Sequence, residues 1–192
     1  MIITIIKMGS EFMGKEHSIL VAGFGGQGIL FAGKQLALAG MYLNKKVTWI
    51  PSYGAEMRGG TSNCTVVISD GEIASPVAYT PDNLIVMSLP SYNKFHGSIA
   101  KGGNLISDSS LVSEKSGRDD INKYYIPATE IAYANNMPQS ANVIMLGKLL
   151  KATNIFTVDE LVMSMRKSIP ESRKNLLEMN IKALNLGYDY TE

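Results

Sequence analysis

Residues 19–30 have the sequence Ile-Leu-Val-Ala-Gly-Phe-Gly-Gly-Gln-Gly-Ile-Leu, an apolar run that breaks into four glycines and then resumes at helical spacing. This order is typical of a strand, a tight loop and the start of a helix. Glycines permit positive φ angles and let a ligand or another subunit approach the main chain. Free N–H groups at the start of the helix would attract an anion. The candidate binding residues are Gly23, Gly25, Gly26, Gln27 and Gly28.

The second strand argues against an ordinary dinucleotide site. The spacing of Gly23, Gly25 and Gly28 matches the dinucleotide fingerprint, which also needs an acidic residue at the end of the next strand to hold the ribose. That strand, residues 45–50, continues instead into Pro-Ser-Tyr, and no acidic residue occurs between Glu16 and Glu56. Two interpretations remain open, an anion site and a loop whose glycines only permit close packing of strand and helix.

A second glycine-containing segment follows directly. Residues 52–64 are Ser-Tyr-Gly-Ala-Glu-Met-Arg-Gly-Gly-Thr-Ser-Asn-Cys, which is too broken by glycine for a helix and carries one carboxylate and one guanidinium. Glu56 and Arg58 are therefore candidate site residues. They could form a local ion pair, contact a partner, bind a ligand or, for Glu56, act in acid–base chemistry.

Together the two motifs resemble the gamma subunit of the 2-oxoacid:ferredoxin (acceptor) oxidoreductases. The resemblance runs from about residue 18 to the C-terminal region and is densest over 21–95. The forms of segments 54–60 and 88–95 are most similar to the 2-oxoglutarate type. Residues 142–147, Asn-Val-Ile-Met-Leu-Gly, resemble a further family segment. Their small and amide side chains are suited to a subunit contact.

The resemblance implies a subunit that is not active alone and contributes no catalytic residue. Its complex, of the EC 1.2.7 type, would use thiamine diphosphate to decarboxylate 2-oxoglutarate oxidatively, transfer the acyl group to coenzyme A and reduce ferredoxin or a similar acceptor. Thiamine diphosphate and iron–sulfur clusters would belong to partner alpha, beta and delta subunits. A phosphate-bearing group such as the coenzyme A tail would lie at the glycine loop, with Gln27 as a further donor. Glu56 would close the site, and Arg58 would meet an acidic substrate or a coenzyme phosphate.

Three alternatives stay open. The substrate could be pyruvate, a branched-chain oxoacid or indolepyruvate. The chain could instead be a stand-alone nucleotide-binding protein, or a scaffold that binds no ligand.

Composition sets further limits. A chain of 192 residues suits a single α/β domain, residues 1–192, with 1–16 as an extension before the first strand. Charged residues make up 18%, fewer than the typical quarter, so a permanent partner or a homodimer of the isolated chain would hide apolar surface. A net charge of +1 gives no footprint for nucleic acid or an anionic membrane.

One cysteine cannot form an internal disulfide or hold a four-cysteine cluster. The resemblance implies that this chain alone binds no cofactor, and no metal is expected either, because the sequence has no cluster of spaced ligands. Cys64 is expected to be a small buried hydrophobe. His17 and His96 are far apart, without the spacing of a metal site. The apolar start, residues 1–8, is too short to span a bilayer and lacks a signal-peptide pattern, which indicates a cytoplasmic protein.

The remaining chain alternates between strands and helices. Strand 47–50 is expected to complete a βαβ unit with helix 29–43. Strand 64–69 should turn at Asp70-Gly71 into a short antiparallel partner, 72–75. Further strands are predicted at 84–87, 105–108 and 124–127, and helices at 90–99, 129–135, 141–151, 157–169 and 172–186.

Local signals mark the last helices. Thr157 and Glu160 form a capping box, and Gly187 lies where a left-handed cap would end the last helix. The predicted fold is a three-layer α/β domain with a mixed, mostly parallel sheet and a hairpin insertion. By the family resemblance, it should be similar to the gamma domain, domain III, of pyruvate:ferredoxin oxidoreductase.

Overall fold

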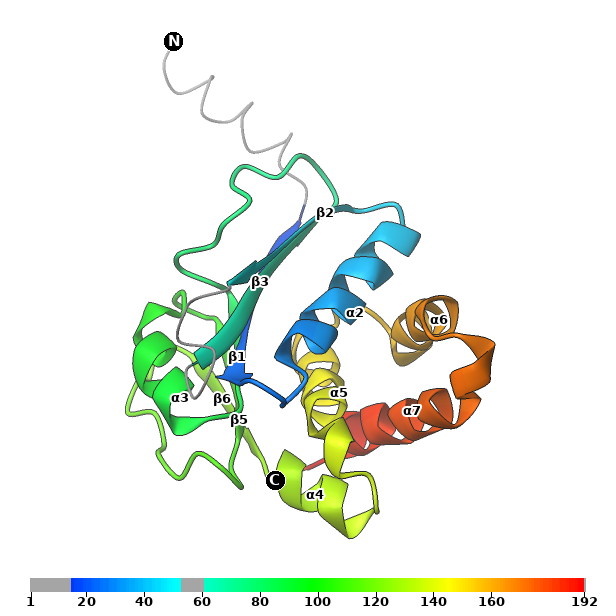
Figure 1. The fold of residues 1–192 in the computed structure, drawn as a ribbon. Coiled ribbons are helices and arrows are strands. Elements are labelled where there is room, and N and C mark those ends of the chain that lie inside the picture. Colours follow the sequence, from blue (N-terminus) through cyan, green and yellow to red (C-terminus); the bar gives the residue numbers. More distant parts are fainter. Residues whose placement is uncertain (1–14, 53–60, 192) are drawn as a thin grey trace.

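A computed structural model describes residues 15–52 and 61–191 of the chain (Figure 1). Within these ranges six strands form one sheet in the order β2-β3-β1-β4-β5-β6. Strands β1, β4, β5 and β6 pair in parallel, whereas β3 is antiparallel to both β1 and β2. The strands are β1 (Glu16–Phe24), β2 (Lys46–Ser52), β3 (Thr61–Ser69), β4 (Asn83–Val86), β5 (Asn104–Asp108) and β6 (Asn122–Ile126).

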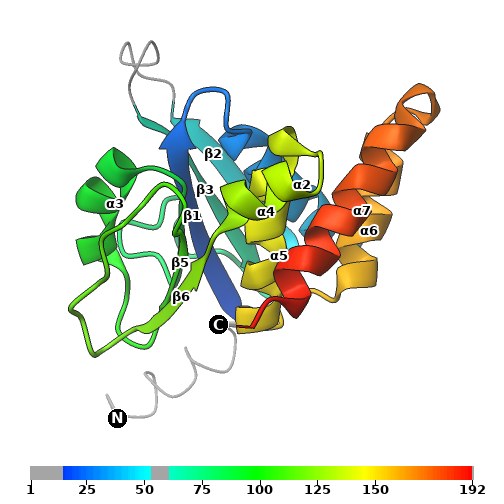
Figure 2. The same cartoon turned by 90° about the horizontal axis from the view of Figure 1, so that it is seen from below.

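Helices cover both faces of this sheet, as Figures 1 and 2 show from two directions. One face carries α3 (Leu89–Phe95), followed by a short 3₁₀ turn, His96–Ser98. The opposite face carries the remaining helices: α2 (Ile29–Tyr42), α4 (Ala128–Ala134), α5 (Ala141–Thr153), α6 (Val158–Ser168) and α7 (Lys174–Asp189). Two further 3₁₀ turns are Pro138–Ser140 and Glu171–Arg173.

The core follows from the alternation of side chains along the central strand. In β1, Ile19 and Val21 join the larger core beneath α2 and α5, whereas Leu20 joins a smaller core with Tyr92 of α3. Because successive strand residues point to opposite faces, a continuous apolar run is needed when both faces are covered. The apolar stretch before the glycines therefore marks the central strand.

Most local predictions are confirmed. The predicted helix 29–43 is α2, and the strands predicted at 84–87, 105–108 and 124–127 are β4, β5 and β6 within two residues. The capping box is present, since Thr157 Oγ1 accepts from the Glu160 N–H and the Glu160 carboxylate accepts from the Thr157 N–H. The predicted mixed, mostly parallel sheet in an α/β fold is confirmed.

The predicted hairpin at Asp70-Gly71 is wrong. No strand occurs at 71–82, and β3 pairs instead with β1 over nine residues and with β2 over seven. Asp70 forms an ion pair with Lys45, and the Gly71 N–H donates to Ser69 Oγ at 3.1 Å. These contacts lie at the end of β3. A hairpin partner has no place beside this strand, because β1 and β2 already form hydrogen bonds along its two edges.

The expected βαβ unit also needs correction. Strands β1 and β2 do run in the same direction, but β3 lies between them and is antiparallel to both. The antiparallel insertion is therefore β3 itself, and β2 becomes an edge strand. Pro51 fits this place, since an edge strand tolerates a residue without an N–H.

The predicted left-handed cap at Gly187 is wrong as well. Gly187 lies inside α7, where a Cβ atom would collide with the carbonyl oxygen of Ile144 in α5. Gly147 of α5 has the reciprocal place, since its Cβ would collide with the carbonyl oxygen of Leu184. The two glycines allow α5 and α7 to cross with their main chains in contact. Among the helices of the described ranges, none has the length and apolar character needed to cross a membrane.

Candidate functional site

The glycine loop lies at the carboxyl edge of the sheet, between two strands whose connections diverge. After β1 the chain enters α2 on one face, and after the adjacent parallel strand β4 it enters α3 on the other face. Open α/β sheets bind ligands in the crevice at such a point, outside the carboxyl ends of the strands. Residues 23–28 of the loop therefore occupy the position in this fold that favours a ligand.

The loop glycines differ in what they do. Gly26 and Gly28 have φ angles of 93° and 73°, which L side chains rarely adopt. Gly25 and Gly26 are exposed to solvent. A Cβ at Gly23 would lie 2.5 Å from Gln27 Oε1, so this buried glycine makes room for the Gln27 side chain. Gly25 and Gly26 thus expose their main chain to solvent. Gly23 lacks a side chain, which leaves room for Gln27 inside the loop.

Gln27 ties the loop to the neighbouring strand. Its Oε1 accepts from the Phe24 N–H at 2.6 Å, and its Nε2 donates to the Met87 carbonyl at 2.8 Å. The Met87 N–H in turn donates to the Ala22 carbonyl at 2.9 Å. The sequence predicted Gln27 as a donor to a ligand. The structure uses one of its two N–H groups to join the loop to the end of β4.

The cap and the charges at the start of α2 favour an anion. Gly28 caps the helix in the left-handed conformation, with no side-chain cap and no acidic residue in the first turn. The helix has 14 residues, so its first N–H groups carry the partial positive charge of a full helix dipole. These features agree with the anion site expected at this position.

Asn142 of α5 supports the loop from the other side. Its Nδ2 donates to the Gly28 carbonyl at 2.9 Å, and the side chain is only 3% exposed. The expectation that Asn142, Met145 and Gly147 contact another subunit is wrong, because all three are buried within this chain. The reason is the crossing of α5 and α7, which covers this face of α5.

Two cavities flank Gly26 at this edge. One, of about 210 Å³, is lined by Gly26, Gln27, Leu111, Thr129 and Tyr133, among others. The other, of about 290 Å³, extends toward α5 and α7. Exposed Gln139 lines both. Sequence inspection missed this arrangement, because the other walls come from segments far from the loop in sequence, from Met87 to Asn180.

Glu56 and Arg58 lie outside the described residues. The described chain resumes at Thr61, which pairs with Phe24 at the start of the glycine loop. On the other side, Ser52 at the end of β2 pairs with Asn63. Both described ends of the segment that carries Glu56 and Arg58 are therefore at the carboxyl edge of the sheet, and one of them, Thr61, lies beside the loop.

Other chemistry-bearing side chains are not gathered here. Burial raises the pKa of the Cys64 thiol to about 11, and the thiol lies within 3.6 Å of the Ile29 carbonyl. This confirms that Cys64 behaves as a buried hydrophobe. Burial lowers the pKa of His17, at the opposite end of β1. Within the described ranges, no three His, Cys, Asp or Glu residues are grouped as metal ligands.

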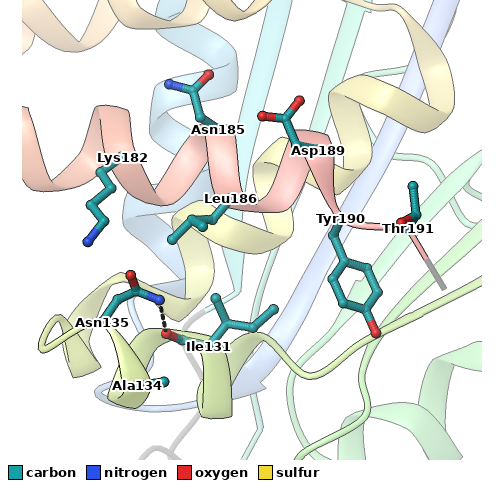
Figure 3. Close-up of a pocket in the computed structure, with 9 residues that line it drawn as sticks. All are labelled: Ile131, Ala134, Asn135, Lys182, Asn185, Leu186, Asp189, Tyr190 and Thr191. Carbon is teal, nitrogen blue, oxygen red and sulfur yellow. Dashed lines mark hydrogen bonds between the residues drawn. The ribbon is translucent and has the colours of Figure 1, made fainter.

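A larger groove lies away from the loop. It measures about 680 Å³ and runs between α4 and the C-terminal part of α7, where Figure 3 shows Ile131 and Leu186 facing each other. Lys182 and Asp189 are also among its lining residues. Asn135 Nδ2 already donates to the Ile131 carbonyl at 3.0 Å. None of the site residues that the sequence predicted is among the described residues that line this groove.

Comparison with protein families gives one match over nearly the whole chain. The model described as pyruvate ferredoxin/flavodoxin oxidoreductase matches residues 18–190. The chain is 39% identical over 177 residues to 2-oxoglutarate synthase subunit KorC of Methanocaldococcus jannaschii, covering 91% of this chain and 93% of that one. It is 36% identical over 178 residues to ketoisovalerate oxidoreductase subunit VorA of Methanothermobacter thermautotrophicus, but spans only 36% of that relative's length.

Solved structures agree with the fold. The gamma subunit of a keto/oxoacid ferredoxin oxidoreductase from Geobacter sulfurreducens superimposes with a TM-score of 0.78 at 27% identity, over 90% of this chain and 96% of that one. A 2-oxoglutarate:ferredoxin oxidoreductase from Magnetococcus marinus gives 0.81 at 23% identity, over 90% of this chain and 30% of its own. The same fold thus occurs both as a separate chain and within a longer one.

Proposed function

The chain belongs to the pyruvate ferredoxin/flavodoxin oxidoreductase family, and we propose that it is the gamma subunit of a 2-oxoglutarate:acceptor oxidoreductase complex. The observation that carries the proposal is the 39% identity to KorC over almost the full length of both chains. The complex would convert 2-oxoglutarate and coenzyme A into succinyl-coenzyme A and carbon dioxide. The two electrons released would pass to ferredoxin or a similar acceptor.

The difficult chemistry would belong to cofactors in partner subunits. Thiamine diphosphate would supply the carbanion chemistry of decarboxylation, and iron–sulfur clusters would carry the electrons. This chain does not fit a cluster, because its single cysteine is buried and the burial keeps its thiol protonated. Its partners would be alpha, beta and delta subunits, and the complex would work in the cytoplasm.

The glycine loop would hold a phosphate-bearing part of coenzyme A. Gly25 and Gly26 are exposed, and the first turn of α2 carries neither a side-chain cap nor an acidic residue, so its N–H groups would attract an anion. Gly23 and Gln27 would keep the loop in place, and Gly28 would set the direction of the helix start. This chain would therefore bind and orient the acyl acceptor, without a catalytic residue of its own.

Glu56 and Arg58 would complete the site from the segment between β2 and β3. Their segment is joined to the carboxyl edge at both described ends, and its second end, Thr61, pairs with Phe24. Arg58 would pair with a coenzyme phosphate or the acidic substrate, because a guanidinium binds two oxygens at once. Glu56 would close the site over the ligand or contact a partner subunit.

A second candidate substrate is 2-oxoisovalerate. The chain is 36% identical to VorA, which is close to its 39% identity to KorC, so the two identities support the two substrates almost equally. Pyruvate and indolepyruvate remain further alternatives within the same reaction class. A stand-alone dinucleotide-binding protein is disfavoured by geometry. Strand β2 is separated from β1 by β3, so its end does not lie beside the loop as the ribose-binding strand of a dinucleotide fold does.

The partner surface would include the carboxyl edge. Three of the exposed large apolar side chains, Phe24, Leu111 and Tyr133, lie on segments that meet there. Burying such side chains against partner subunits would remove apolar surface from water. The isolated chain would use the same surface to form a homodimer.

The first test is co-purification of the chain from its native cells under anaerobic conditions, followed by assay of viologen reduction. We expect partner subunits with thiamine diphosphate and iron–sulfur clusters, and reduction that depends on both 2-oxoglutarate and coenzyme A. Activity with 2-oxoisovalerate or pyruvate instead would correct the substrate. A chain recovered without partners would refute the proposal.

A matched pair of glycine variants tests the loop within the assembled complex. Gly26→Ala and Gly102→Ala introduce the same strain, since both residues have positive φ and open space around the added Cβ. Gly102 lies before β5, at the opposite edge of the sheet. We expect the KM for coenzyme A to rise about tenfold for Gly26→Ala alone, equivalent to the loss of one charge-assisted contact. Equal KM values in both variants would exclude the loop as the coenzyme site.

A further inference from the structure

The junction between α6 and α7, residues 166–177, concentrates positive charge on the surface. It contains one acidic residue, Glu171, and four of the chain's 18 basic residues, although the whole chain has a net charge of only +1. Figures 1 and 2 show the junction at the outer end of the two helices, away from the sheet. All four basic residues are exposed to solvent: Arg166, Lys167, Arg173 and Lys174.

Three of these cations have no anionic partner in the described part of the chain. The four ion pairs found there include none of Arg166, Arg173 and Lys174. Lys167 differs, because its Nζ lies 4.3 Å from the centre of the Tyr42 ring and joins the end of α6 to α2. Packing within the chain therefore accounts for one of the four cations and leaves the other three to solvent.

Two of the unpaired cations lie where the helix dipole opposes them. Arg173 is the N-cap of α7 and Lys174 is its first residue, with no side-chain cap and no acidic residue in the first turn of this helix. The start of a helix carries partial positive charge, which favours anions, and Ser, Thr, Asp or Asn is the preferred N-cap. Helix stability thus does not explain these two residues. Departures from local rules of this kind are expected at functional sites.

A hollow of about 270 Å³ lies between the two helices at the junction. Arg166 of α6 and Lys174 of α7 line it, and the half-buried side chains of Ile169 and Leu177 add apolar surface. Glu171 lines it as well, without an ion pair to either cation. A carboxylate on a short alkyl chain suits this lining. Its carbons can pack on the apolar side chains while its oxygens accept from the guanidinium and ammonium groups.

The lining favours an acidic polypeptide over a nucleic acid. A protein that binds nucleic acid usually carries a basic stripe or a strongly basic domain, whereas this chain is nearly neutral and its cations gather at one end of a helix pair. The carboxylate of Glu171 would repel a phosphate backbone, and the apolar surface of Ile169 and Leu177 has no use for one.

We propose that the junction between α6 and α7 docks an acidic segment of another polypeptide, with one of its Asp or Glu side chains in the hollow between Arg166 and Lys174. Arg173 attracts further carboxylates of the same segment. None of the residues that line the hollow lines either cavity beside Gly26, so this surface is separate from the glycine loop. The inference does not depend on the reaction of the complex.

The first test maps the binding of hexaglutamate on the ¹⁵N-labelled full chain by NMR, with hexaglutamine as the uncharged control. We expect saturable shifts of backbone N–H signals within residues 166–177 for hexaglutamate and none for hexaglutamine. Raising the ionic strength from about 0.05 to about 0.5 M should weaken binding at least about tenfold, because salt screens exposed charges. Absent shifts, or shifts spread over the chain, would overturn the proposal.

Charge reversals on the two sides of the hollow test the contact itself. Arg166→Glu and Lys174→Glu should each weaken the binding of hexaglutamate at least about fivefold, because an exposed pair is lost and repulsion replaces it. The matched control is Lys101→Glu, the same change at an exposed lysine in the loop before β5. It should leave binding within about twofold. Equal weakening by Lys101→Glu would show that only net charge matters, which contradicts a docking surface.

Arg173→Asp separates binding from folding. The change gives α7 a preferred N-cap and an anion at the positive end of its dipole, so the midpoint of urea denaturation should rise. Binding of hexaglutamate should nevertheless weaken at least about fivefold. A lower midpoint would mean that Arg173 supports the fold, and unchanged binding would mean that it attracts no partner. Either result contradicts the proposal.

Photo-crosslinking in the native cells tests the chemistry of the partner. A benzoylphenylalanine replaces Ser172, an exposed and uncharged residue of the junction, and the crosslinked peptides are sequenced by mass spectrometry. We expect a peptide of another protein that is rich in Asp and Glu, and loss of this crosslink when Arg166→Glu is added. Three outcomes would refute the proposal: no crosslink, a crosslink to nucleic acid or to a peptide without acidic residues, and a crosslink that persists with Arg166→Glu.

Discussion

The glycine loop after β1 and the crossing of α5 and α7 both depend on glycine, for different physical reasons. Gly26 and Gly28 in the loop have positive φ angles, which the turn into α2 requires. Gly147 and Gly187 at the crossing are ordinary helical residues, and they are required because any Cβ would collide with main-chain atoms of the other helix. A glycine in the sequence does not reveal which of these two needs it meets.

The comparison predicts the largest loss of stability at the crossing. Gly187→Ala puts a Cβ against the Ile144 carbonyl, and main chain cannot move aside as a flexible side chain can. We expect the free energy of unfolding to fall by about 3 kcal/mol, as for overpacking against a rigid neighbour, despite the better helix propensity of alanine. Urea denaturation followed by circular dichroism measures the change.

Gly97→Ala is the control for this substitution, because an added Cβ there has nothing within 4 Å. Its free energy of unfolding should stay close to that of the unmodified chain. A stable Gly187→Ala variant would mean that α5 and α7 can separate at little cost, and the close crossing would then not be essential.

An intermediate loss is expected in the loop. Gly28→Ala must hold an L residue at a φ of 73°, and its Cβ would also displace Asn142 Nδ2. The left-handed conformation costs about 1–2 kcal/mol, and the lost hydrogen bond from Asn142 adds about 1. Urea denaturation should therefore show a loss of about 2–3 kcal/mol.

Gly26→Ala separates the two contributions. Its φ is 93° but its Cβ would meet nothing within 4 Å, so we expect only the conformational cost of about 1–2 kcal/mol. If Gly26→Ala proved as destabilising as Gly28→Ala, the contact between Asn142 and Gly28 would contribute nothing to stability.

The smallest effect is expected where a glycine contacts a side chain. In α2, a Cβ at Gly33 would meet Cys64 Sγ and lie 3.1 Å from Trp49 Nε1. Overpacking against side chains that can adjust costs about 1–2 kcal/mol, and the better helix propensity of alanine returns about 1, so Gly33→Ala should cost at most about 1 kcal/mol. Denaturation of the single and double variants with Cys64→Ala forms a double-mutant cycle.

In that cycle, Cys64→Ala removes the atom that the new Cβ would strike. The double variant should therefore be more stable than the sum of the two single changes predicts, by about 1 kcal/mol. Strict additivity would show that α2 accommodates the added Cβ by shifting as a whole, and that Cys64 is not the obstacle.

Local elements were predictable because their signals are local. The apolar run before the loop, the helical spacing of α2 and the capping box of α6 each depend on residues that are close in sequence. The position of the glycine loop between β1 and α2 was predictable too, because it follows from adjacent residues. The pattern at Asp70-Gly71 led to a wrong prediction of a hairpin. The local residues suit such a turn, but β3 pairs with the distant strands β1 and β2 instead.

The sequence by itself determined the elements, the central strand and the family, since these follow from side-chain periodicity and short motifs. Only the tertiary structure decided that β3 inserts between β1 and β2, that Gly187 serves a helix crossing and that Arg166 and Lys174 line one hollow. The physical reason is that strand order, helix crossing and burial depend on contacts between residues far apart in the chain. No local pattern records which distant segment supplies the other half of such a contact.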